Sequence, residues 1–141
     1  MYFLPKTVNR LIDQFSTLPG IGKKTAQRLA FYILKSNKER IFHLSESIKE
    51  VKNRIIFCSI CHGITETDPC IICVNVKRNN SIICIVEDAK DIFTFEKTNS
   101  FEGKYHVLGG VLSPLDGVGP DDLNIKSLLN RIKSGMEVII A

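Results

Sequence analysis

The chain has 141 residues, a length that suggests one domain or a few small units, and its 44% hydrophobic and 24% charged residues are typical of a globular protein. No apolar stretch approaches the roughly 20 residues of a membrane span, and the amino terminus lacks the features of a signal peptide, so we expect a cytoplasmic protein. The net charge is +4, with eleven Lys/Arg against four Asp/Glu in residues 1–57 and eight against eleven in residues 58–141. This imbalance indicates either a polyanion bound to the first half or a solvated helical surface rich in lysine.

Three apolar patterns at helical spacing predict three helices in the first 57 residues. The first pattern covers residues 8–15, the second covers residues 26–34, and residues 18–22 break the periodicity between them. The third helix carries an apolar seam spaced alternately by three and four residues, and we expect this seam to lie in a helical core. Its members are Ile41, Leu44, Ile48, Val51 and Ile55.

From residue 81 onwards the sequence predicts alternating strands and helices. Residues 82–86 are a short continuous apolar run that contains Cys84, which is typical of a strand buried on both faces of a sheet. The elements that follow are a helix at residues 88–97, a strand at 105–108, a helix that begins at Asp121 and Asp122, and a strand at 137–140. The apolar face of the second helix consists of Ile125, Leu128, Leu129 and Ile132. This order predicts a parallel sheet with right-handed crossovers, and because the chain stops one residue past the last strand we expect an incomplete α/β domain.

A glycine hairpin joins the first two predicted helices. Gly20 and Gly22 let the backbone come close to a ligand, and the first N–H groups of the second helix can hold a phosphate oxygen. Lys23, Lys24 and, one turn later, Arg28 add positive charge beside that position. This combination predicts a helix-hairpin-helix that binds the nucleic-acid backbone without reading its sequence. The alternative is a tight interhelical turn with no ligand.

Four of the five cysteines follow the pattern C-x2-C-x8-C-x2-C, the most chemically specific feature of the chain. Two such pairs can place four thiolates around one tetrahedral ion, most often zinc. His62 beside Cys61 could substitute for one of them, but four cysteines already suffice. The other interpretations are two disulfides, which need an oxidising compartment, or unrelated buried cysteines. Four thiolates leave no open coordination position, so we predict one zinc ion with a structural and not a catalytic role. The predicted ligands are Cys58, Cys61, Cys70 and Cys73.

Acidic residues follow the strand at residues 82–86. Glu87 lies directly at its carboxyl end, where a carboxylate can bind magnesium or act as a general base, and Asp88 and Asp91 are close behind. Asp116 is the candidate second carboxylate, since the chain contains no D-x-D pair. The alternative is that Glu87 and Asp88 cap the following helix.

Taken in order, these parts resemble the RecR family of bacterial recombination mediators. The resemblance is carried by the hairpin at residues 18–22 with the segment 26–30 after it, by the cysteine pattern, and by the long stretch at residues 105–120. It covers essentially the whole chain and implies an α+β protein in several parts. These parts are a helix-hairpin-helix region at residues 1–57, a C4-type zinc finger at 58–73, and an incomplete Toprim domain with a parallel sheet at 81–141.

The resemblance also implies a function. Family members bind single- and double-stranded DNA and work with the partners RecO and RecF to load recombinase onto single strands coated by single-strand-binding protein. Lys23, Lys24 and Arg28 match the positions where the family's hairpin meets DNA, and Glu87 matches the Toprim glutamate, although the family is not known for Toprim chemistry. Family members form ring-like dimers and tetramers and continue past residues 137–140 with a segment involved in assembly. The sequence therefore does not predict the oligomeric state of this chain.

Two other classes of protein remain open from the sequence. One is an enzyme, a fragment of a Toprim nuclease, primase or topoisomerase that would use Glu87, Asp116 and magnesium. The other is a degraded gene product that folds poorly, because half a sheet buries little surface. The leading prediction is a DNA-binding repair factor that is stabilised by zinc and is not an enzyme.

Overall fold

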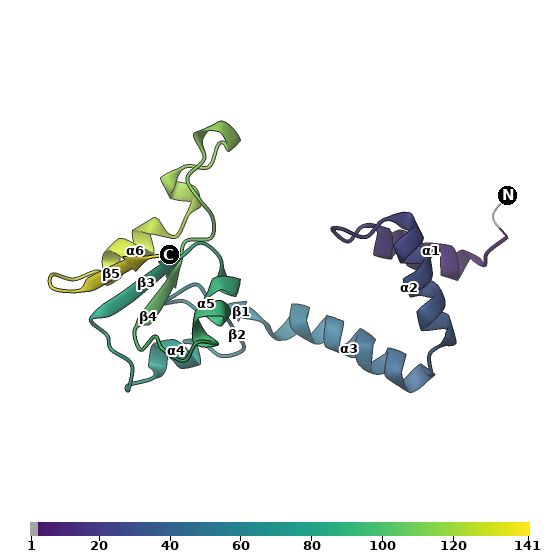
Figure 1. Ribbon diagram of the computed structural model, residues 1–141, viewed down its shortest axis with the longest axis horizontal. Helices are drawn as coiled ribbons and strands as arrows, with labels where there is room; N and C mark the ends of the chain where they lie inside the picture. Colours follow the sequence, from purple (N-terminus) through teal and green to yellow (C-terminus); the bar gives the residue numbers. More distant parts are fainter. Residues whose placement is uncertain (1–2) are drawn as a thin grey trace. The chain divides into compact units, whose positions relative to one another are not determined.

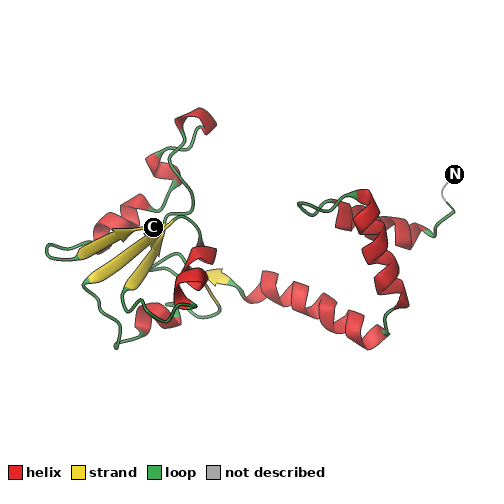
Figure 2. Ribbon diagram, viewed as in Figure 1, coloured by secondary structure: helices red, strands yellow, loops and turns green. Residues whose placement is uncertain are grey.

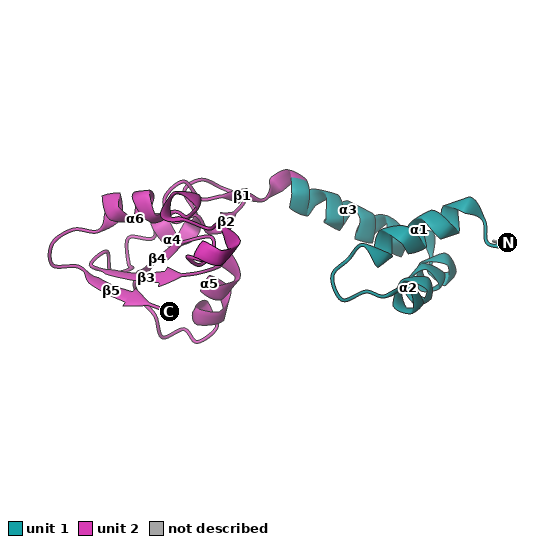
Figure 3. Cartoon of the chain, turned by 90° about the horizontal axis from the view of Figure 1, so that it is seen from above, with its two compact units in different colours: residues 1–52 teal, residues 53–141 magenta. Residues whose placement is uncertain are grey.

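The computed structural model describes residues 3–141. The chain forms two compact units, and the boundary between them along the sequence lies between Lys52 and Asn53 (Figure 3). The first unit is helical, whereas the second combines strands and helices (Figure 2). Within the described residues, no helix has the length and apolar character that crossing a membrane requires. This division into a helical part and a mixed part is the fold class that the sequence predicts.

Two helices of the first unit, α1 (Lys6–Ser16) and α2 (Lys23–Lys35), pack against each other on either side of the glycine turn (Figure 1). The buried residues of α2 are Ala26 and Ala30, one helical turn apart. Side chains this small allow a neighbouring helix to approach closely. The helical hairpin is therefore held by a small core whose residues follow the predicted periodicity.

The third helix, α3 (Lys38–Arg54), forms as predicted, and the side chain of Asn37 caps it by accepting a hydrogen bond from the backbone N–H of Arg40 at 2.8 Å. Its seam does not form the predicted core. No residue of α3 is buried, and Ile48 and Val51 remain 60% and 59% exposed. The expectation of a helical core was wrong here, because periodicity identifies an apolar face but not what covers it.

The second unit begins with two short segments that carry the cysteines. A hairpin pairs β1 (Ile56–Phe57) antiparallel with β2 (Ile64–Thr65), and a single helical turn, α4 (Ile71–Val74), follows. The apolar and cysteine pattern did not predict this turn of helix. Both segments lie ahead of the main sheet in the chain.

The main sheet consists of three parallel strands in the order β4-β3-β5. The central strand is β3 (Ile82–Val86), and it is flanked by β4 (Lys104–Val107) and β5 (Glu137–Ile140). The parallel sheet predicted from the sequence is confirmed. Helices that connect parallel strands pack on the faces of the sheet, so both faces of β3 can be covered.

Alternate residues of β3 contribute to two different cores. Cys84 and Val86 pack with α5 (Ala89–Glu96), whereas Ile83 and Ile85 pack with Leu128 of α6 (Ile125–Arg131). Alternation along a strand places neighbouring side chains on opposite faces, so one apolar run serves both cores. Cys84 is a buried core residue, as predicted.

The start of α6 differs from the prediction. Asp121 and Asp122 lie in a short 3-10 turn, Pro120–Asp122, and the helix itself begins only at Ile125. The backbone N–H of Asn124 donates to the carbonyl oxygen of Leu108 at 2.9 Å, which holds the chain against β4 before the helix can start. The predicted apolar face is also narrower, because Leu129 is 65% exposed.

Candidate functional site

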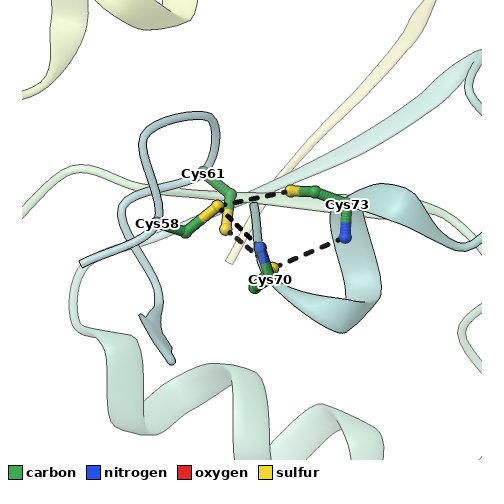
Figure 4. Close-up of side chains that lie close together, drawn as sticks. All are labelled: Cys58, Cys61, Cys70 and Cys73. Carbon is green, nitrogen blue, oxygen red and sulfur yellow. Dashed lines mark hydrogen bonds between the residues drawn. The ribbon is translucent and has the colours of Figure 1, made fainter. Parts of the chain in front are cut away.

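The four cysteines of the sequence pattern converge on one point (Figure 4). Their Sγ atoms all lie within 4.8 Å of one another, with 3.6 Å between Cys61 and Cys70 and 3.9 Å between Cys58 and Cys73. All four thiols are free, and all but Cys73 are buried. Zinc with Zn–S bonds of about 2.3 Å in a tetrahedron places its sulfurs about 3.8 Å apart. The four side chains therefore fit a zinc ion.

Two short loops hold these sulfurs, which we call the first knuckle (residues 58–63) and the second knuckle (residues 70–75). In the first knuckle the backbone N–H of Cys58 donates to the carbonyl of Gly63 at 2.8 Å, and that of His62 donates to Cys58 at 2.9 Å. These bonds close a tight turn in which His62 takes a positive φ of 60°. In the second knuckle the Cys70 side chain caps α4 by accepting from the N–H of Cys73.

Backbone N–H groups point at the sulfur atoms in both knuckles. Cys61 Sγ accepts from Gly63 at 3.4 Å, Cys58 Sγ from Cys70 at 3.3 Å, and Cys70 Sγ from Cys73 at 3.4 Å. Hydrogen bonds to sulfur favour the thiolate over the thiol. The backbone is therefore arranged to support the charged form that a metal needs.

The pKa values of three of these thiols are shifted in different directions. A hydrogen bond with Cys73 lowers the pKa of Cys61 to about 5, although burial opposes this shift. The pKa of Cys73 is raised, first by its bond with Cys61 and then by burial, and burial also raises the pKa of Cys70. One thiolate therefore forms readily and suppresses the ionisation of its neighbours. A divalent cation at the centre of the cluster would offset this repulsion.

The first knuckle is anchored on the main sheet. The backbone N–H of Val107 on β4 donates to the carbonyl of Cys61 at 2.8 Å, and the Nε2 atom of His62 lies 2.8 Å from the hydroxyl of Ser127 on α6. His62 is therefore engaged with Ser127 and is not part of the sulfur cluster. This position agrees with the choice of the four cysteines, and not His62, as the ligand set.

Two buried polar residues of β4, which the sequence analysis did not assign, also lie at this junction. His106 is fully buried and bonds to the backbone of Asn124 and the guanidinium of Arg131. Lys104 is 7% exposed and donates to the backbone of the second knuckle. The predicted strand at residues 105–108 contained His106 but not Lys104, because the observed strand β4 starts one residue earlier, and the sequence did not reveal the partners of either residue.

The glycine hairpin of the first unit leaves the start of α2 open. Gly20 takes a φ of 77°, a left-handed conformation that side chains resist, whereas Gly22 is extended at a φ of −78°. No other atom lies within 4 Å of where a Cβ would stand at either position. Gly22 is the N-cap and supplies no side-chain hydrogen bond, so the first N–H groups of α2 can bind an anion.

Three cations lie in the first two turns of α2. Lys23, Lys24 and Arg28 are exposed, and none of them forms an ion pair with the residues that the structure describes. Arg28 follows Lys24 by one helical turn and so shares its side of the helix. The predicted hairpin residues are thus brought together, with charge and N–H donors that suit a phosphate.

The acidic residues after β3 serve different purposes. Asp88 caps α5, because its side chain accepts from the N–H of Lys90 at 3.0 Å while Asp91 accepts from the N–H of Asp88 at 3.0 Å. This capping role was the alternative considered from the sequence. Glu87 is exposed and lies with Asp88 in a cleft of about 460 Å³ that Gly109 and Asn124 also line.

Asp116 does not line the cleft that contains Glu87. Its carboxylate accepts from the hydroxyl of Ser113 at 2.5 Å, within the loop that carries both residues. In the part of the chain that the structure describes, the four cysteines are the one group of at least three His, Cys, Asp or Glu residues that could hold a metal ion. Within the described residues, Glu87 therefore belongs to no group of three or more such side chains, and Asp116 is absent from the lining of its cleft.

Comparison with known proteins identifies related chains. The family model described as RecR, helix-hairpin-helix matches residues 8–52, and one described as Toprim domain matches residues 81–141. A curated protein named Recombination protein RecR from Chloroherpeton thalassium is 48% identical over 149 residues, covering all of this chain and 73% of that relative. Proteins of the same name from Natranaerobius thermophilus and Staphylococcus aureus strain JH9 are also 48% identical, covering 92% and 97% of this chain and 65% and 70% of the relatives.

Proposed function

Since the chain belongs to the RecR family of recombination proteins, we propose that it is a DNA-binding factor of recombinational repair that works by assembly and not by catalysis. In this proposal it helps to load recombinase onto single-stranded DNA together with RecO and RecF, in the cytoplasm. The chain spans 65–73% of the length of its three relatives, so activities of the whole protein come to it as proposals. The observation that carries the DNA-binding part is the open start of α2 beside three exposed cations.

The hairpin would hold the backbone of DNA and not its bases. A phosphate oxygen would accept hydrogen bonds from the first N–H groups of α2, where the helix dipole is positive. Lys23, Lys24 and Arg28 would neutralise neighbouring phosphates, and the left-handed Gly20 keeps side-chain atoms out of the approach. Contacts of this kind do not depend on base sequence, so single and double strands of any sequence are suitable ligands.

We propose that the cysteine cluster holds one zinc ion with a structural role. Cys58, Cys61, Cys70 and Cys73 would supply all four ligands, and the sulfur separations of 3.6 Å and 3.9 Å support this assignment. When bound, a structural zinc ion typically supplies about 10–16 kcal/mol of folding free energy in small peptides. The two knuckles bury few apolar side chains of their own, so they depend on such a cross-link.

The proposal assigns no catalytic residue. The competing function is a magnesium-dependent nuclease or primase fragment that uses Glu87, which is exposed in a cleft. The capping role of Asp88 and the absence of Asp116 from the lining of this cleft argue against it, because magnesium-dependent phosphoryl chemistry needs several convergent oxygen ligands. Magnesium-dependent nicking of plasmid DNA that disappears in Glu87→Gln would favour the enzyme instead.

The proposed protein partners are RecO, RecF and further copies of the chain. Family membership supports all three, and no residue of the described part is assigned to a particular partner. The apolar seam of α3 is exposed in a single chain, with Leu44 46% and Ile48 60% accessible, and burial of this seam in an assembly would be consistent with its composition.

DNA binding through the hairpin can be tested with a triple substitution of Lys23, Lys24 and Arg28 to alanine. We expect weaker binding to every DNA sequence, because the lost contacts are to phosphate. The slope of log K against log salt should become shallower by roughly 0.9 for each lost contact to duplex DNA and roughly 0.7 for single strands. Fluorescence anisotropy over a range of salt concentrations measures both quantities.

The matched control replaces Lys35, Lys38 and Lys52, three exposed lysines of the first half, by alanine. This variant has the same net charge as the hairpin variant, so it should retain most of the binding and the slope. Equal losses in both variants would indicate non-specific attraction to a basic surface. Unchanged binding in the hairpin variant would show that the turn has no nucleic-acid ligand.

A further inference from the structure

Lys104 is a positively charged residue that is buried in the main sheet. It is the first residue of β4, pairs in register with Ile83 of the central strand, and is only 7% exposed. Lysine is almost never fully buried unless its charge is compensated, because the ammonium loses its hydration. No carboxylate of the described residues lies within ion-pair distance of Lys104. Something else must compensate this charge.

The ammonium group of Lys104 donates three hydrogen bonds to one segment. The acceptors are the carbonyl oxygens of Ile72 at 2.8 Å, Cys73 at 3.0 Å and Asn75 at 2.8 Å. A lysine has three donors, so all of them are used. The acceptors belong to the end of α4 and the residues after it, where carbonyl groups lack partners within a helix and carry partial negative charge.

One of these acceptors is the backbone of a predicted metal ligand, Cys73. A divalent ion with four thiolate ligands carries net negative charge, so a bound zinc ion would place a negative centre beside the second knuckle. The three carbonyl groups and this centre together would compensate the buried ammonium. The positive charge of Lys104 and the negative charge of the metal site would thus stabilise each other.

Strand β4 contacts both knuckles at separate positions. Val107 binds the carbonyl of Cys61 in the first knuckle, and Lys104 binds the carbonyl of Cys73 in the second. Three residues along a strand span roughly 10 Å, so the two contacts set the spacing of the two cysteine pairs. Both cysteine pairs are therefore tied to one strand of the sheet.

We propose that Lys104 is a positioning residue for the metal site, which fixes the second knuckle and offsets the negative charge of the thiolates. This inference rests on the proposed zinc site. It assigns a function to a residue of the sheet that is not itself a metal ligand. Residues that support metal ligands in this way typically change metal affinity by about 10–100-fold when they are replaced.

The test compares two variants. Lys104→Met removes the charge and the three donors but keeps an unbranched side chain of similar length, and Lys104→Arg keeps the charge. The matched control is Lys77→Met, an exposed lysine just beyond the second knuckle. Zinc affinity is measured by competition with a chelating dye, and the geometry of the site by the thiolate-to-cobalt absorption of the Co²⁺ form. Circular dichroism of the metal-free proteins reports folding separately.

We expect zinc affinity to fall by about 10–100-fold in Lys104→Met, by less in Lys104→Arg, and not in Lys77→Met. Wild-type affinity and an unchanged cobalt spectrum in Lys104→Met would overturn the proposal. So would equal losses in Lys104→Met and Lys77→Met. If Lys104→Met folds only with metal, zinc release from the loaded protein after addition of chelator replaces the affinity measurement, and a wild-type rate overturns the proposal. A wild-type protein that binds no zinc would instead contradict the metal site itself.

Discussion

His106 is held in one protonation state by its two neighbours. Arg131 can only donate a hydrogen bond, so the Nδ1 atom 2.9 Å from its guanidinium is an acceptor. The proton is therefore on Nε2, which donates to the carbonyl of Asn124 at 2.8 Å. Burial is the main cause that lowers the pKa of His106 to about 4; the bond to Asn124 opposes this shift, and electrostatic interactions with Arg131 and His62 add to it. Protonation would remove one bond and bring two cations together.

We predict that His106 stays neutral until the solution is strongly acidic. Its pKa of about 4 in the folded protein lies below the ordinary value of 6.5, so the unfolded chain takes up the proton first as pH falls. The stability that the neutral ring contributes is therefore complete above about pH 6.5 and is lost as pH falls towards about 4. Nitrogen NMR of the ring should show the Nε2–H tautomer at pH 5.5.

His106→Gln should unfold with a weaker dependence on pH between about 6.5 and 4 than the wild-type protein, because this linkage is absent. His43→Gln, on α3 of the other unit, is the control and should keep the wild-type profile. A ring that titrates near pH 6.5 in the folded protein would contradict the assignment.

Helix α5 shows how one element distinguishes two adjacent carboxylates. Asp88 and Asp91 form a capping box at its amino end, whereas the side chain of Glu87 is exposed and takes no part in the cap. A capping carboxylate satisfies N–H groups that the helix itself cannot, and it suits the positive end of the dipole. The acidic sequence after β3 thus contains two residues that cap the helix, Asp88 and Asp91, and one residue, Glu87, outside the cap.

We predict that Asp88→Ala destabilises the second unit by about 1 kcal/mol, the usual effect of losing an N-cap. Glu87→Ala should change stability by no more than about 0.5 kcal/mol, because the side chain is exposed and outside the cap. Urea denaturation of both variants under the same conditions measures the difference. Equal destabilisation would mean that Glu87 supports the fold as much as Asp88 does.

At the scale of the whole molecule, the chain divides into two compact units with different sources of stability. The first depends on the packing of α1 against α2 around small buried residues such as Ala26. The second contains the sheet, both knuckles and all five cysteines. Since Val107 and Lys104 connect the knuckles to β4, metal binding and the folding of this unit are expected to be coupled.

We therefore predict that removing zinc with a strong chelator loosens the second unit and leaves the first intact. Amide hydrogen exchange should accelerate in both knuckles and in β4, because these segments share hydrogen bonds, while α1 and α2 keep their protection. Cys58→Ser lacks a ligand and should show the faster exchange without chelator. Exchange that is equally slow with and without zinc in the wild-type protein would contradict a structural metal.

The sequence by itself determined the features that depend on local spacing. Helical periodicity located α1, α2 and α3, the continuous apolar run located β3, and the spacing of the cysteines identified four side chains that the structure brings together. The Gly20 turn was also readable, because a left-handed backbone and a helix start are properties of a few consecutive residues. Each of these signals arises from residues close together along the chain.

Only the tertiary structure decided which distant residues meet. The seam of α3 has no cover in the described chain, Asp116 does not line the cleft that contains Glu87, and the backbone of Asn124 bonds to Leu108 before α6 starts. Lys104 and His106 look out of place in an apolar strand until their partners at residues 70–75 and 124–131 are seen. A buried charge is tolerated or excluded by groups from other elements, so its function depends on contacts that local sequence does not encode.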